Sequence, residues 1–97
     1  VRAIALDPIL WHAGGVQLTE GIAIVALESD DPAAGELRFY DLTNLDAPRE
    51  LGPRVSRARK LYAAALTRMS DGRFLALSWD DDVIELHRSR GRGLYAL

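Results

Sequence analysis

Apolar and polar positions alternate in short runs along the chain, and the same order of runs occurs twice, at 16–31 and at 67–82. Each copy has a glycine turn, then an apolar run, then an acidic turn. The aligned turn residues are Gly21 with Gly72, and Asp30 and Asp31 with Asp81 and Asp82. Short apolar runs separated by Gly and Asp are typical of strands joined by tight turns. The pattern therefore predicts a repeat of β units.

The first half predicts four strands. A short strand at 16–18 precedes an apolar run at 22–27 that is too short for a helix and rich in β-branched residues. This run indicates a strand buried on both faces. The segment 36–42 alternates and predicts a half-exposed strand. A short edge strand at 49–52 ends at Pro53, which cannot donate to a central ladder.

The second half predicts strands at 74–79 and 83–87, with His87 facing solvent. The segment 56–70 has two interpretations. An apolar stripe at helical spacing favours a helix there. The repeat instead aligns 67–69 with the strand at 16–18, and we expect a strand, because tertiary context often overrides local propensity.

Each half thus contains about four antiparallel strands within roughly 40–50 residues, which is the size of a β-propeller blade. We predict a single all-β domain over 1–97, a β-propeller-type repeat of two antiparallel four-stranded blades. The first blade covers 12–53 and the second covers 60–97. Residues 1–11 would form an additional edge segment.

A buried apolar strand at 21–26 is followed by Gly-Glu-Leu at 35–37, Asp-Leu-Thr-Asn at 41–44, a proline at 48 and Leu-Gly at 51–52. In this order the segment 21–52 resembles a known family, the LVIVD-type repeat of bacterial β-propellers. In that repeat a buried strand leads to a Gly-Leu start, an Asp-Val-Ser-Asp/Asn-like turn, a proline and a short final strand. The second copy departs from it after Leu86, where His-Arg-Ser-Arg replaces Asp-Leu-Thr-Asn. The resemblance implies a propeller and no particular substrate.

Two blades do not close a propeller, which needs about four to eight. An open pair leaves apolar blade faces in water, so the expected partners are copies of this chain or further blades of a longer one. Three copies would close a six-bladed ring. The start at Val1, with no basic and apolar leader, fits an exported bacterial protein whose leader has been removed, a trimmed chain, or an excerpt.

Composition narrows the functional classes. The net charge of −2 gives no reason to expect nucleic acid or an anionic membrane as a partner. The absence of cysteine excludes disulfide and thiolate chemistry. No apolar run approaches the roughly 20 residues that span a bilayer. We therefore expect a soluble protein.

The repeated acidic turns are the first candidate site. If the halves are blades, these turns share one rim with His12, and carboxylates with an imidazole can bind a divalent cation. The candidate metal ligands are Asp30, Asp31, Asp81 and Asp82. Asp is also common in hairpin turns for backbone reasons, and no known metal-binding spacing occurs here. The favoured expectation is therefore no cofactor, with a divalent cation as the alternative.

Three further residues are candidates for ligand binding. His12 precedes a pair of glycines at the expected mouth of the channel. The glycines permit positive φ or a close backbone approach. Arg57 and Arg59 belong to the basic loop 54–60, which can hold phosphates or be neutralised by the acidic turns on the same rim. Neutralisation is the simpler interpretation.

No serine-nucleophile or phosphate-loop pattern occurs, so no catalytic residue is assigned. The sequence favours a non-catalytic binding or scaffold module with its ligand on the rim. The alternative is a metal-assisted hydrolase or lactonase, with His12 and the paired aspartates at the funnel.

Overall fold

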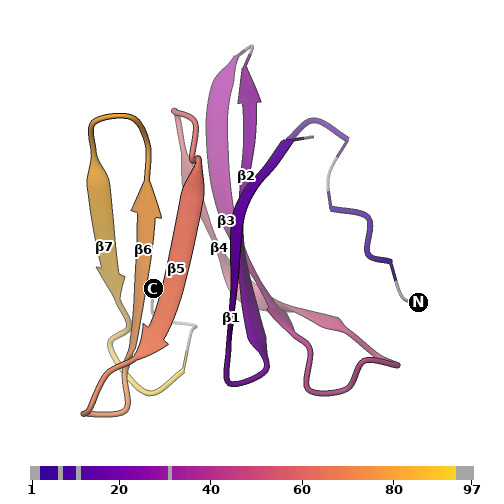
Figure 1. Cartoon of the computed structure of the whole chain (residues 1–97), viewed down its shortest axis with the longest axis vertical. Coiled ribbons are helices and arrows are strands. Elements are labelled where there is room, and N and C mark those ends of the chain that lie inside the picture. Colours follow the sequence, from indigo (N-terminus) through magenta and orange to yellow (C-terminus); the bar gives the residue numbers. More distant parts are fainter. Residues whose placement is uncertain (1–2, 7, 11, 31, 94–97) are drawn as a thin grey trace.

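The computed structural model describes residues 3–6, 8–10, 12–30 and 32–93, and that part of the chain contains seven strands and no helix. The strands form two antiparallel sheets (Figure 1). Sheet A has the order β1 (His12–Thr19), β2 (Ile22–Asp30), β3 (Ala33–Asp41) and β4 (Arg49–Arg57). Sheet B has the order β5 (Ala63–Arg68), β6 (Phe74–Trp79) and β7 (Ile84–Arg88). The all-β fold class is confirmed, and the two sheets form an open pair.

Two of the hairpins turn on glycines with positive φ. Glu20 and Gly21 join β1 to β2 with φ of 51° and 77°. Two consecutive residues of positive φ match the twist of the flanking strands, which makes this a tight hairpin. Gly72, with φ of 86°, lies in the turn between β5 and β6. The aligned glycines of the sequence therefore occupy corresponding turns.

The main core lies between the sheets. The face of sheet A toward sheet B and the facing side of sheet B, with the segment before β5, bury one cluster of apolar side chains. Its members are Ile24, Ala26, Leu37, Phe39, Val55, Leu61, Leu66, Phe74 and Ala76. We call these two surfaces the inner faces. Their contact holds the sheets together through apolar burial.

The edge strand β1 lies against β5 at the junction of the sheets. The Gly15 N–H donates to the Tyr62 carbonyl at 2.7 Å. The Gln17 side-chain oxygen accepts from the Leu66 N–H at 2.6 Å, and the Thr19 hydroxyl donates to the Leu66 carbonyl at 2.7 Å. A Cβ on the glycine before Gly15 would clash with the Tyr62 carbonyl. The paired glycines therefore serve a close backbone approach.

The outer face of sheet A has its own cover. Leu6 and Leu10 pack against the cluster of Ala23, Val25, Leu27 and Tyr40. The buried guanidinium of Arg38 donates to the Leu6 carbonyl at 2.5 Å. We call residues 3–6 and 8–10 the N-terminal cover. It lies on the side of sheet A away from sheet B (Figure 1).

The strands match the sequence interpretation in part. The apolar run 74–79 is β6, and the ambiguous segment 56–70 contains the strand β5 and no helix. β4 continues through Pro53 to Arg57, because an edge strand can hold a proline whose missing N–H faces away from its neighbour. The strands β1 and β2 also extend into positions that we expected to be loops.

Three other expectations differ from the structure. Within the described residues sheet B has three strands instead of four, and the segment 94–97, expected to end that unit, lies outside them. The described part of 1–11 adds no edge strand and covers a sheet face instead. His87 faces the inner side, with only 11% of its side chain exposed. The described part of the chain holds no helix long and apolar enough to cross a membrane.

Candidate functional site

Charged side chains gather at one end of the two sheets. The strand order brings the start of β1, the end of β2, the segment before β5 and the β6–β7 turn together there. We call this end the charged rim. Its members are His12, Glu28, Asp30, Arg57, Arg59, Lys60, Tyr62, Asp80, Asp81 and Glu85. His12 therefore lies at the same end of the sheets as Asp30 and Asp81, but its carboxylate partner there is Glu28.

His12 and Glu28 form the most distinctive pair on the rim. They are opposite each other on β1 and β2, and His12 Nδ1 lies 2.6 Å from Glu28 Oε1. The His12 side chain is 56% exposed, whereas that of Glu28 is 5% exposed. Within the described residues, Glu28 Oε2 is buried without a hydrogen-bond partner. A carboxylate in this position fixes the orientation of the imidazole.

The two arginines expected to bind ligand are engaged by carboxylates. Arg57 Nε donates to Glu85 Oε2 at 2.7 Å. Arg59 pairs with Asp80 at 2.9 Å and also with Glu85. Burial acts to raise the pKa of Glu85, but the hydrogen bond from Arg57 and the charges of both arginines outweigh it and lower that pKa. Intramolecular neutralisation of the basic loop is therefore what the geometry shows.

The candidate metal ligands are spread over several contacts. Asp30 pairs with the Lys60 ammonium, and this bond raises the pKa of Lys60. Asp81 Oδ2 lies 3.5 Å from the Tyr62 hydroxyl. Asp82 is exposed in the β6–β7 turn, and Asp31 lies outside the described residues. Among the residues the structure describes, no three His, Asp or Glu side chains are grouped to hold a metal ion.

The sequence analysis expected apolar blade faces in water without assigning residues to them, and the structure identifies the residues of one such surface. The outer face of sheet B is apolar and uncovered within the described residues, with Trp79 44%, Ile84 62% and Leu86 65% exposed. We call it the open face. Its residues are Ala63, Ala65, Thr67, Leu75, Leu77, Trp79, Ile84, Leu86 and Arg88. Such an area of exposed apolar side chains on adjacent strands is typical of an interaction site.

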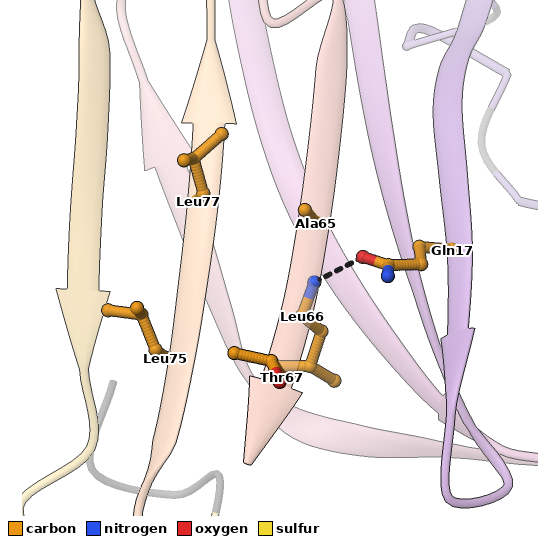
Figure 2. A pocket seen from close by; sticks show the side chains of 6 residues that line it. All are labelled: Gln17, Ala65, Leu66, Thr67, Leu75 and Leu77. Carbon is orange, nitrogen blue, oxygen red and sulfur yellow. Dashed lines mark hydrogen bonds between the residues drawn. The ribbon is translucent and has the colours of Figure 1, made fainter. Parts of the chain in front are cut away.

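The open face contains a hollow of about 160 Å³ between β5, β6 and the side chain of Gln17. Figure 2 shows Leu75 and Leu77 on β6, and Ala65 and Thr67 on β5, around it. The amide oxygen of Gln17 is held by the Leu66 N–H (Figure 2). The wall of the hollow is therefore fixed by the junction of β1 and β5.

The residues of the open face could not be assigned from the sequence, because β7 alternates apolar and polar residues and either set can face inward. With His87 outward, Ile84 and Leu86 would point inward. The structure reverses this, because Glu85 ion-pairs with Arg57 on the inner side. That partner is 28 residues away in the chain, so local pattern carries no signal for it.

No protein-family model, curated protein or solved structure matches the chain. The charged rim and the open face are therefore the features from which a function has to be argued.

Proposed function

We propose that this chain is a non-catalytic binding or scaffold module, a pair of propeller-type blades that associates with further β-sheet through the open face. The observation that carries the proposal is the exposure of Trp79, Ile84 and Leu86 on a sheet whose opposite face packs against sheet A. Apolar patches on adjacent strands lose contact with water when another sheet covers them.

Two features support this function. The antiparallel order β1 to β4, followed by a return of the chain to β5 beside β1, agrees with the path expected of consecutive blades. The cations of the rim are held by carboxylates of the same chain, as with Arg57 and Glu85. Because these cations are already paired with carboxylates, the charged rim is better suited to a scaffold than to catalysis.

Binding of an environment-sensitive dye tests the proposed function. At low protein concentration, anilinonaphthalene sulfonate should bind the open face and fluoresce. Leu86→Glu should reduce this signal strongly, because it places a charge on the face. The matched control is Leu45→Glu, at another exposed leucine that lies in the β3–β4 loop. Absence of the signal, or an equal loss in both variants, would refute the proposal.

A metal-assisted hydrolase or lactonase is the second candidate. The observation that favours it is the pairing of His12 with the buried Glu28, one oxygen of which has no partner in the described residues. Elemental analysis of the purified chain separates the two functions. One equivalent of a divalent ion that is lost on Asp31→Ala or Asp82→Ala supports the enzyme, and a metal-free protein without hydrolytic activity supports the module.

A further inference from the structure

We infer that the partner of the open face is a second copy of this chain, docked face to face about a two-fold axis with the strands of the two copies antiparallel. This inference rests on the proposed function, because it takes the open face to be an association surface. It adds the identity of the partner and the geometry of the contact.

The other sheet faces offer a copy less apolar surface. The inner faces of both sheets are packed against each other. The outer face of sheet A lies under the N-terminal cover, where Leu6 and Leu10 are packed and Arg38 holds the Leu6 carbonyl. Val16 and Leu18 on β1 stay 65% and 61% exposed beside that cover, whereas the apolar residues of the open face extend over all three strands of sheet B. A copy meets the open face best with its own open face, which makes an isologous contact.

The charges at the two ends of the open face determine how the second copy is oriented. Asp81 and Asp82 are exposed in the β6–β7 turn at one end. Arg88 and Arg90 are exposed at the opposite end, where β7 finishes, and the nearby Asp71 is paired there with Arg73. A two-fold axis across the strands places the acidic end of one copy over the basic end of the other. An axis along the strands would place like charges together, which is unfavourable.

The register then places the Trp79 side chain of one copy at the hollow of the other. Leu77 is opposite Ala65 on one side and Leu86 on the other, so this row lies at the centre of the open face. With the axis through that row, Trp79 of one copy lies over Leu75 and Thr67 of the other. These two residues line the hollow. A Trp ring in an apolar pocket is a typical energetic centre of an interface.

Sedimentation velocity of the full chain over a range of concentrations tests the inference. We expect a reversible equilibrium between monomer and dimer. Leu86→Glu and Trp79→Ala should each raise the dissociation constant by about 30-fold or more. The matched control is Leu18→Glu, the same change on β1 at a side chain that is 61% exposed on the opposite side of the molecule. It should leave the dimer intact. An equal loss in Leu18→Glu would show a head-to-tail contact and overturn the inference.

Charge exchange tests the orientation. Arg88→Asp and Asp82→Arg should each weaken the dimer, and the two changes in one chain should restore it. Failure of the double variant to restore the dimer would contradict the antiparallel geometry. A chain that stays monomeric, yet keeps dye binding that depends on Leu86, would overturn the second copy as partner and preserve the proposed function. A monomer without dye binding would overturn both.

Discussion

The close approach of β1 to β5 makes Gly14→Ala a sharp test of how the two sheets are joined. A Cβ at Gly14 would lie 3.0 Å from the carbonyl carbon of Tyr62, 3.3 Å from the carbonyl oxygen of Leu61, and closer still to the Tyr62 oxygen. All three are backbone atoms. The clash can therefore be relieved only by moving β5 away from β1.

The magnitude follows from two costs. Overpacking of a tight site costs about 1–3 kcal/mol. Separation of the strands also weakens the hydrogen bond from the Gly15 N–H to the Tyr62 carbonyl, a loss of about 0.5–1.5 kcal/mol. We expect Gly14→Ala to lower the free energy of unfolding by about 1.5–4.5 kcal/mol, and the Tm by roughly 6–36 °C for a domain of this size.

Urea denaturation followed by circular dichroism measures this loss. The matched control is Gly52→Ala on the edge strand β4, where an added Cβ would meet no atom within 4 Å. The control should stay within about 0.5 kcal/mol of the wild type. If Gly14→Ala is equally harmless, β1 and β5 are not in backbone contact and the arrangement of the sheets is wrong.

Three further predictions concern the core and two titrating groups. Phe39→Ala should destabilise the chain by about 3–5 kcal/mol in the same assay, since Phe39 is fully buried between the sheets, and a loss below about 1 kcal/mol would contradict that burial. Thr43→Val should raise the pKa of Asp41 in an NMR titration. The hydrogen bonds from the Thr43 hydroxyl and N–H, with that from Arg49, hold the pKa of Asp41 at about 2. The stabilisation by the Asp41 carboxylate is therefore complete above pH 3.8, its ordinary pKa, and is lost as the pH falls through about 2. An unchanged Asp41 pKa in this variant would show that the Thr43 hydroxyl is not the cause. Burial lowers the pKa of His87 most, and the charge of Arg57 lowers it further. The unfolded chain therefore binds the proton more readily than the folded chain, and the free energy of unfolding should fall as the pH drops below 6.5. His87→Gln should flatten this dependence in urea denaturation at several pH values, and a slope equal to that of the wild type would exclude His87 as its source.

Much of the fold could be predicted from local signals. The run 74–79 is a strand with the predicted bounds, because six apolar or small residues between turn signals leave little choice. The aligned Gly21 and Gly72 both adopt positive φ. The strand within 56–70 was predicted from the repeat against its helical stripe, and β5 confirms that choice.

The rest depended on contacts that the sequence does not display. β7 alternates apolar and polar residues, and a shift of one position exchanges its faces. The choice was made by the ion pair of Glu85 with Arg57, on a strand of the other sheet. The placement of His12 and Asp30 at the same end of sheet A could be predicted, because an antiparallel hairpin brings its ends together. The pair of Asp30 with Lys60 agrees with the expected neutralisation of the basic loop 54–60 by the acidic turns. The individual partners could not be predicted, because they depend on how the chain returns from β4 to β5.

The central claim is that the open face is presented by the monomer and buried by association. Methyl NMR with a soluble paramagnetic probe measures this directly at several protein concentrations. The account predicts that the methyl groups of Ile84 and Leu86 are strongly broadened by the probe in dilute solution and become protected as the concentration rises, while those of Leu18 remain accessible throughout. Protection of Ile84 and Leu86 at every concentration, or at none, would contradict it.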